Sequence, residues 1–392
     1  MAPPSAPASV DGAAVPPEGG AFGAGLDRLR DAFVHRLAHP GALRAAAALP
    51  LTRPLARRSA AALFDLVSGF VYTQILLACV RLELFALLLE RARRPEELAP
   101  RLGLDLDATR QLLDAAVAVG VLKRRFTGRY APTTLGLAIA TSPGIQRMIE
   151  HNLLLYRDLE DPVALLRGER PADTALAAYW PYAGERPGAF DADAARPYSE
   201  LMGASQDLVA HEVLDAWDFS RHRRLLDVGG GNGTFLAAVV ARHPALEGVL
   251  FDLPPVAALA EERFREAGLG DRVEAVGGSF LEDPLPTGAD VVSLVRVLHD
   301  QDDARARSLL AAVHGVLPPG GTLLVAEPMR GARAARRVGD AYFAFYLRAM
   351  GRGRPRSPEE IEGLLREAGF RNVRARPTHV PLQTSVLVAD RP

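Results

Sequence analysis

Residues 224–235 read Arg-Leu-Leu-Asp-Val-Gly-Gly-Gly-Asn-Gly-Thr-Phe, a run in which apolar residues give way abruptly to glycine. Residues 225–228 have the length and composition of a buried strand, and Thr234 begins a pattern with helical spacing. Between them, residues 229–233 form a loop with almost no side chains. Glycines are needed where the backbone takes positive φ or lies directly against a ligand. The run therefore predicts a strand, a tight loop and a helix N-terminus.

The spacing of the glycines narrows the choice of ligand. A dinucleotide-binding loop has the pattern Gly-x-Gly-x-x-Gly, but the third position here is Thr234. This argues against a pyrophosphate. Asp227 followed by Gly-x-Gly-x-Gly resembles the first motif of S-adenosylmethionine-dependent methyltransferases, in which the loop packs on the amino-acid end of the cofactor. A plain tight turn is the alternative for the loop taken alone.

Length and composition set the broad class of the chain. Its 392 residues and 42.0 kDa are enough for two or three domains. A content of 48% hydrophobic and 24% charged residues is typical of a soluble globular protein, and a net charge of -1 gives no general attraction to nucleic acid or membranes. Cys79 is the one cysteine in the sequence, which excludes an intramolecular disulfide and a cysteine-rich metal site and fits a reducing cytoplasm.

The N-terminal part of the chain is unusual in composition. Residues 1–25 are rich in Ala, Pro and Gly without a signal-peptide pattern, and we expect a disordered leader. Residues 26–60 contain seven Arg and two Asp, with apolar residues repeating at helical spacing. Two interpretations stay open: a solvated helix that docks on its own domain, and a basic amphipathic element at a membrane surface.

Residues 60–90 follow a strongly apolar helical pattern. Arg81, Glu83 and Glu90 interrupt it, so we expect no apolar run of about 20 residues that would span a membrane. The pattern predicts a buried interface helix instead.

A winged-helix outline follows. Helical patterns over 95–102 and 107–119 precede a basic hairpin over 121–130. Because winged helices commonly read DNA, a regulator that only senses the cofactor is one hypothesis. The second helix is nearly neutral, however, and is unsuited to phosphates. We therefore predict a helical, winged-helix-like dimerisation domain over 26–140, a homodimer and no nucleic-acid partner.

Residues 141–210 are expected to form a helical connector. Aromatic and Met side chains recur in it at helical spacing, which usually indicates core packing. If a cleft forms beside the glycine loop, this connector would supply its apolar wall, with Met148 and Tyr156 as candidate pocket residues.

From residue 211 onward, apolar runs alternate with helical patterns, which predicts a parallel sheet with helices on both faces. The predicted strands are 225–228, 248–251, 273–276, 289–297, 322–326, 373–376 and 384–389. The last two are joined without a helix. This ending resembles the seven-stranded, doubly wound methyltransferase sheet, in which the last strand is antiparallel. The expected fold class is therefore α/β, with a catalytic domain over 211–392.

Residues at the strand ends are the candidates for chemistry, because ligands of open parallel sheets bind beyond the carboxyl ends of the strands. Asp252 ends the second strand, where a carboxylate accepts hydrogen bonds from ribose hydroxyls or caps the following helix. His299 follows the fourth strand; such a histidine is either structural or a base that takes a proton from a hydroxyl. Glu327 ends the fifth strand, where it would orient that imidazole or cap a turn.

Four segments, in this order, are similar to the family of small-molecule O-methyltransferases that includes the plant phenolic and acetylserotonin enzymes. They are 227–233, 251–254, 297–300 and 325–328, and the likeness covers about residues 60–390. The resemblance implies that S-adenosylmethionine is the cofactor, without a metal. It also implies that His299 is the general base and Glu327 its partner. The cofactor-binding residues that it implies are Asp227, Gly229, Gly231, Gly233, Asp252, Leu253, Ser279 and Phe280.

Two positions depart from that family. Ser279 stands where many relatives have an acidic residue beside the adenine. Pro355 stands where relatives have a second glutamate flanking the base, within the run of residues 353–357. The catalytic set of the phenol-methylating members is therefore incomplete in this chain.

Three further segments are similar to the carotenoid O-methyltransferases of purple photosynthetic bacteria: 22–30, 50–54 and 339–346. That resemblance implies transfer to the tertiary 1-hydroxyl of an acyclic carotenoid such as hydroxyneurosporene or demethylspheroidene. So apolar an acceptor needs an apolar tunnel. Helical spacing predicts one from Tyr342, Phe343, Tyr346 and Met350.

The acceptor also bears on location. A carotenoid needs access to a membrane, which would give residues 26–60 a peripheral contact in an otherwise cytoplasmic protein. The alternative acceptors are a phenol, a polyketide or a tetrapyrrole.

Overall fold

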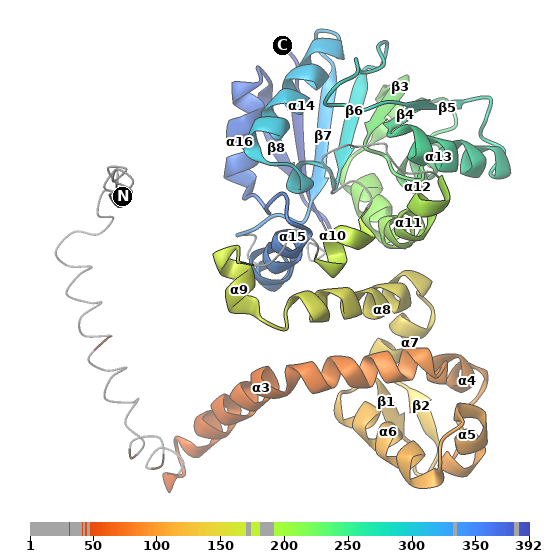
Figure 1. Cartoon of the computed structure of the whole chain (residues 1–392), viewed down its shortest axis with the longest axis vertical. Helices are drawn as coiled ribbons and strands as arrows, with labels where there is room; N and C mark the ends of the chain where they lie inside the picture. Colours follow the sequence, from red (N-terminus) through yellow and green to blue (C-terminus); the bar gives the residue numbers. More distant parts are fainter. Residues whose placement is uncertain are drawn as a thin grey trace, which may run out of the picture. The chain divides into compact units, whose positions relative to one another are not determined.

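The fold is seen in a computed structural model (Figure 1). The structure describes residues 48–169, 174–180, 192–331, 335–379 and 384–392, together with residues 31, 41 and 44. The chain divides into two compact units, residues 1–74 and 75–392. The leader expected over 1–25 and much of the basic element expected over 26–60 lie outside the described residues.

The helix α3 (Arg53–Arg81) has an exposed apolar surface in its N-terminal part. Five apolar side chains there are between 62% and 79% exposed: Leu63, Phe64, Leu66, Val67 and Phe70. By length and composition alone, α3 is long and apolar enough to cross a membrane. The expectation that charged residues leave no such run is therefore not met for α3. The predicted buried interface helix stays a prediction, because these exposed side chains leave the surface open to a partner.

The helical pattern over 60–90 does not form one helix. Glu83 takes a left-handed conformation with φ 51°, and a second helix, α4 (Leu84–Glu90), begins after it. The last turns of α3 and the first turn of α4 share one apolar core, which includes the fully buried Cys79 and Leu84. Burial raises the pKa of the Cys79 thiol to about 12.

The winged-helix outline is present as predicted. Helices α5 (Pro95–Leu102) and α6 (Leu106–Ala118) precede an antiparallel hairpin of β1 (Leu122–Arg124) and β2 (Tyr130–Pro132).

Polar side chains of α6 bond inside this domain. Asp114 accepts a hydrogen bond of 2.6 Å from the Tyr130 hydroxyl, and Arg110 pairs with Glu96 at 2.9 Å. A DNA-reading helix would direct such groups at phosphates instead.

The connector is helical, as expected. Its helices are α7 (Thr134–Ala140), α8 (Pro143–Asp158), α9 (Pro162–Arg167), α10 (Ala175–Tyr179) and α11 (Ala192–Ala216). Trp180 and Tyr198, at the end of α10 and in α11, share an aromatic cluster with Tyr346, far along the chain. The connector thereby packs against the C-terminal part of the chain.

Seven strands of the described chain form one sheet, which confirms the predicted fold class. They are β3 (Arg224–Val228), β4 (Glu247–Asp252), β5 (Val273–Gly277), β6 (Val291–Val295), β7 (Thr322–Glu327), β8 (Arg371–Arg376) and β9 (Ser385–Asp390). Their order is β5-β4-β3-β6-β7-β9-β8, and β9 is antiparallel to both of its neighbours. The strand order reverses between β3 and β6, which is where a doubly wound sheet binds its ligand.

Helices cover both faces of the sheet (Figure 1). On one face, α14 (Asp303–Val316) and α16 (Pro358–Glu367) pack on the strands through Leu309 and Leu365. On the other face lie α11, α12 (Thr234–Arg242) and α13 (Pro254–Glu266). A π-helix, η3 (Arg337–Phe343), runs into α15 (Ala344–Met350) beside the carboxyl ends of the strands.

Candidate active site

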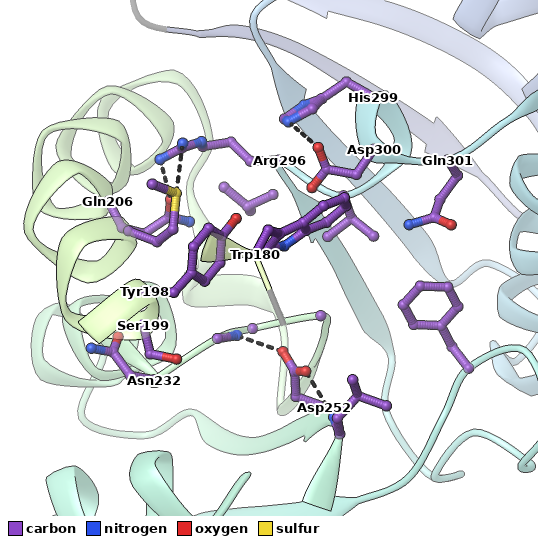
Figure 2. A pocket seen from close by; sticks show the side chains of 18 of the residues that line it. Trp180, Tyr198, Ser199, Gln206, Asn232, Asp252, Arg296, His299, Asp300 and Gln301 are labelled. Atoms are coloured by element: carbon purple, nitrogen blue, oxygen red, sulfur yellow. Dashed lines mark hydrogen bonds and ion pairs between the residues drawn. The ribbon is translucent and has the colours of Figure 1, made fainter. Parts of the chain in front are cut away.

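A cavity opens at the carboxyl ends of β3, β4 and β6 (Figure 2). It receives residues from the loop after β3, from the end of β4, from the residues after β5 and from the short helix η2 (Leu298–Asp300) after β6. Helices α11 and α15 contribute the opposite wall. Its polar lining residues are Ser199, Gln206, Asn232, Asp252, Ser279, Arg296, His299, Asp300, Gln301 and Arg352.

The glycine loop serves two purposes. Gly229 and Gly231 line the cavity with φ values of 69° and 60°, and an added Cβ at Gly231 would meet nothing within 4 Å. Gly233 does not line the cavity; a Cβ there would lie 2.5 Å from the Phe264 ring. Gly231 therefore keeps room for a ligand, whereas Gly229 lets the loop approach Val297, 2.8 Å from where its Cβ would stand, and Gly233 permits α12 to pack closely on α13.

The two aspartates of the predicted cofactor site have different surroundings. Asp252 lines the cavity, and its carboxylate accepts hydrogen bonds from the amides of Gly231 at 2.8 Å and Leu253 at 2.7 Å. Burial raises its pKa to about 6, although those amides oppose the shift. Asp227 lies below the loop, accepts a 2.6 Å hydrogen bond from the Ser293 hydroxyl, and has a pKa that burial raises to about 7.

Leu253, Ser279 and Phe280, which the sequence predicts to bind the cofactor, also line the cavity. One orphaned polar atom faces the same region: the buried Ser199 hydroxyl has no hydrogen-bond partner among the described residues. A carboxylate, a free hydroxyl and a side-chain-free loop fit a cofactor with a ribose and an amino-acid end.

His299 is held from two sides. Its Nε2 lies 3.0 Å from Asp300 Oδ1, whereas its Nδ1 lies 3.9 Å from Glu327 Oε1, too far for a hydrogen bond. The Glu327 carboxylate instead accepts from the backbone amides of Val297 at 3.2 Å and His299 at 3.1 Å. Glu327 therefore fixes the backbone of the turn, and Asp300, which sequence reasoning missed, fixes the ring.

The carboxylates also set the charge of the ring. Burial alone would lower the pKa of His299, but the charge and hydrogen bond of Asp300, together with the charge of Glu327, raise it above its usual value. The nearby Arg296 opposes them. Burial raises the pKa of Glu327. The charge of His299 and the hydrogen bond from its backbone amide act against this rise.

Arg296 is a second residue that the sequence did not reveal. It lines the cavity with φ 61°, a strained value for a residue with a long side chain, and it donates to the Ser205 hydroxyl at 2.7 Å. Strain of this kind collects at functional sites. Its cation would suit the carboxylate of an amino-acid group.

The apolar wall includes three of the six predicted pocket residues. Phe343, Tyr346 and Met350 line the cavity. Tyr342 and Met148 lie behind this wall, with the Tyr342 hydroxyl 3.9 Å from the Met148 sulfur. Tyr156 is 36% exposed on α8 and is not among the lining residues.

A buried histidine stiffens the same wall. His151 Nε2 lies 2.9 Å from the Tyr346 hydroxyl, and burial lowers the pKa of His151 to about 4. The pair is therefore neutral at physiological pH. Among the described residues, no group of three or more His, Cys, Asp or Glu side chains is arranged to hold a metal.

The chain matches two family models. Residues 156–371 match the model of the O-methyltransferase domain, and residues 64–142 match that of the O-methyltransferase dimerisation domain. The chain is 44% identical over 344 residues to the demethylspheroidene O-methyltransferase of Cereibacter sphaeroides, covering 88% of this chain and 90% of that protein. It is equally similar to the enzyme of that name from Rhodobacter capsulatus, of which 85% is covered.

Solved structures agree with this likeness. The CalO1 methyltransferase of calicheamicin biosynthesis, with SAH bound, matches with a TM-score of 0.72 and 30% identity, over 85% of this chain and 98% of that one. The mitomycin 7-O-methyltransferase MmcR matches with a TM-score of 0.69 and 27% identity, over 86% of this chain and 100% of that one. By its domain match over more than half of its length and by these relatives, the chain belongs to the S-adenosylmethionine-dependent O-methyltransferase family.

Proposed function

We propose that this O-methyltransferase methylates the tertiary 1-hydroxyl of an acyclic carotenoid of the hydroxyneurosporene and demethylspheroidene type. The observation that carries this proposal is the 44% identity, over 88% of the chain, to two enzymes named for demethylspheroidene. The apolar cavity wall, with Trp180, Phe343 and Met350, supports an acceptor of low polarity.

S-adenosylmethionine supplies an electrophilic methyl group when bound. We propose that Asp252 accepts hydrogen bonds from its ribose, that the Ser199 hydroxyl gains a partner from it, and that Arg296 pairs with its carboxylate. All three residues line the cavity together with the Gly229 and Gly231 backbone.

His299 is the proposed general base. His299 and Asp300 both line the cavity, and Nε2 is bonded to Asp300 there. The acceptor hydroxyl takes the place of Asp300 beside Nε2 and donates its proton to that nitrogen, while Nδ1 carries the other ring proton. Nδ1 faces Glu327 at 3.9 Å, where the carboxylate stabilises the positive charge that develops on the ring. Because a tertiary alcohol is a very weak acid, proton loss accompanies attack and does not precede it.

The acceptor is tested with labelled S-adenosylmethionine and mass spectrometry of the products. The panel contains a 1-hydroxy acyclic carotenoid, the same carotenoid without its hydroxyl, a phenol, a polyketide and a tetrapyrrole. We expect a methylated product from the hydroxycarotenoid and none from its deoxy control. Faster methylation of another member would overturn the proposed acceptor while leaving the family assignment intact.

The two site roles are separated by a pair of variants. His299→Ala should lower kcat by on the order of a hundredfold, because no group takes the proton, and should leave the cofactor dissociation constant unchanged. Asp252→Ala should do the reverse and weaken cofactor binding. Turnover and calorimetric binding measure the two effects. Unchanged kcat in His299→Ala, or unchanged affinity in Asp252→Ala, would remove that residue from its role.

We also propose that the protein is a homodimer, which the match of residues 64–142 to a dimerisation domain supports. Peripheral membrane contact through residues 26–60 is a further proposal, motivated by the seven arginines of that segment and by the apolar acceptor. Sedimentation with anionic vesicles tests it, and failure of the protein to pellet with them at low salt would exclude it.

A further inference from the structure

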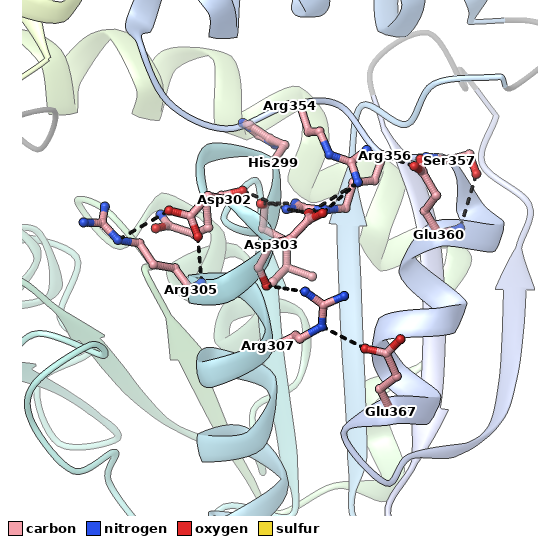
Figure 3. Close-up of polar contacts among 12 residues, drawn as sticks. His299, Asp302, Asp303, Arg305, Arg307, Arg354, Arg356, Ser357, Glu360 and Glu367 are labelled. Carbon is pink, nitrogen blue, oxygen red and sulfur yellow. Dashed lines mark hydrogen bonds and ion pairs between the residues drawn. The ribbon is translucent and has the colours of Figure 1, made fainter. Parts of the chain in front are cut away.

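The segment around Pro355, which replaces the second flanking glutamate, contacts the turn that carries His299. Residues 353–357, here called the strap, run beside η2, the turn that carries His299 (Figure 3). The Arg354 amide donates a 2.9 Å hydrogen bond to the His299 carbonyl. Gly353 has φ 77°, and a Cβ on it would lie 2.0 Å from that carbonyl oxygen. Only glycine at position 353 lets the strap come this close to His299, because any Cβ there would overlap the His299 carbonyl oxygen.

Arg356 makes the firmest contact of the strap. Its side chain is 0% exposed, and it donates to the Leu298 carbonyl at 2.6 Å and to the Gln301 carbonyl at 2.8 Å. These two carbonyls stand on either side of His299 in the sequence. A planar guanidinium satisfies both at once because its donors point in fixed, diverging directions.

The cation of Arg356 is compensated from α14. Asp303, in the first turn of that helix, accepts from Arg356 Nε at 3.1 Å and from its terminal nitrogen at 2.7 Å. Arg354 pairs with the same carboxylate at 3.2 Å. A buried cation without such a partner would be strongly destabilising, so Asp303 makes the buried arginine tenable.

The backbone around His299 is thus held by hydrogen bonds to both its amides and its carbonyls. Glu327 holds the amides of Val297 and His299, while the strap holds the carbonyls of Leu298, His299 and Gln301. Burial raises the pKa of Glu327, and the charge of Arg356 is among the contacts that oppose this. Arg356 therefore limits the rise in the pKa of Glu327, the carboxylate that faces His299 Nδ1.

We propose that Arg356 is a positioning residue for His299, which it holds in place through the carbonyls on either side of η2. The inference rests on the proposed role of His299 as the base. A base displaced by about 1 Å loses on the order of a hundredfold in rate, so a rigid turn has a direct catalytic value. A purely structural staple between α14 and the strap is the competing explanation.

The test is a double-mutant cycle with Arg356→Lys and His299→Gln. Lysine keeps the positive charge, but its single ammonium group cannot bond two carbonyls and a carboxylate at once, as the planar guanidinium does. We expect Arg356→Lys alone to lower kcat on the order of a hundredfold, with the cofactor dissociation constant and its KM unchanged. In the His299→Gln background, the same change should cost less than about twofold, because there is no base left to misplace.

The outcomes separate the two proposals. An equal loss from Arg356→Lys in both backgrounds, or a parallel loss of cofactor affinity, would overturn the positioning role. Full turnover of His299→Gln alone would instead overturn the role of His299.

A matched control is Glu367→Gln, which breaks the 2.9 Å pair with Arg307 between α16 and α14 without touching η2. We expect wild-type kcat from it. If Arg356→Lys yields no folded protein, Asp303→Asn keeps the arginine and loosens its anchor. We then expect about a tenfold loss of kcat that depends on His299, and unchanged kcat in Asp303→Asn would overturn the proposal.

Discussion

At the scale of single residues, the proposed mechanism depends on the protonation of His299. The ring lies between Asp300, at 3.0 Å from Nε2, and Glu327, at 3.9 Å from Nδ1. Both carboxylates favour the charged imidazolium, and Arg296 is the cation that opposes them. A base with a raised pKa binds a proton more tightly. It is also already protonated, and therefore unable to act as a base, up to a higher pH.

This balance gives a pH prediction. The rate should be low at acid pH, where His299 is protonated, and should rise as the pH passes the raised pKa of His299. Asp300→Asn removes a charge that raises the pKa of His299. The burial of the ring, which lowers that pKa, remains. We therefore expect the acid limb of kcat against pH to move to lower pH, whatever happens to the plateau.

A nearby aspartate provides the control. Asp302 caps α14 and is half exposed, and asparagine is an equally good cap. Asp302→Asn should leave the acid limb where it is. An acid limb that does not move in Asp300→Asn would mean that Asp300 does not set the basicity of His299.

At the scale of elements, the unit of β3, glycine loop and α12 forms one wall of the proposed cofactor site. Gly231 has φ 60° and open space where a Cβ would stand, and its amide donates to Asp252. Gly231→Ala should cost roughly 1–2 kcal/mol of folding free energy, because alanine is strained in this conformation. Its methyl group would also enter the cavity. We expect a clear rise in the cofactor dissociation constant, measured by calorimetry.

Gly268, just after α13, is a control that separates the loss of stability from the loss of cofactor binding. It has φ 67°, a Cβ added to it would meet nothing within 4 Å, and it is not among the cavity-lining residues. Gly268→Ala should lower the melting temperature about as much as Gly231→Ala and leave cofactor binding unchanged. Equal affinity in the two variants would show that the loop does not contact the cofactor.

Elements with local causes were predictable from the sequence. The strands β3 to β9 begin and end within about two residues of their predicted bounds, and β6 is two residues shorter at each end than the predicted run 289–297. Apolar runs of four to six residues between glycine-rich turns leave few alternatives to a buried strand. The break at Glu83 was missed because a left-handed glutamate has no sequence signal.

The site was predictable only where it lies at strand ends. Asp252 and His299 follow directly from that rule. Ser199 did not, because it lies on α11, far from the strands in the sequence. Arg296 and Asp300 lie at the same strand end as His299, but the predicted strand ran to residue 297, and the sequence does not show which of these side chains reach the cavity. Phe343 lines the cavity and Tyr156 does not, which likewise depends on how η3 and α8 pack and is not fixed by helical spacing alone.

At the scale of the whole molecule, the exposed apolar surface of α3 needs a cover. Phe64 and Phe70 are 64% and 63% exposed, and each contributes about 1.5–3 kcal/mol when fully buried. If this surface joins two copies, Phe64→Glu together with Phe70→Glu should weaken the dimer by at least about a hundredfold. Light scattering after gel filtration measures the mass.

The hairpin between β1 and β2 provides a control, because Phe126 is also exposed there. Phe126→Glu should leave the mass at that of a dimer. A dimer that persists in the α3 variant would move the interface elsewhere. If the variant instead stays dimeric but no longer pellets with vesicles, α3 contacts lipid.

The buried thiol described with α4 makes this question accessible to spectroscopy. Cys79 is the one cysteine of the sequence, is fully buried, and has a pKa of about 12, so it stays protonated and unreactive toward maleimides. A reporter cysteine such as Leu63→Cys would therefore take a spin label selectively, without prior removal of Cys79. Pulsed electron resonance between two labelled copies would then give the separation of the two α3 helices directly.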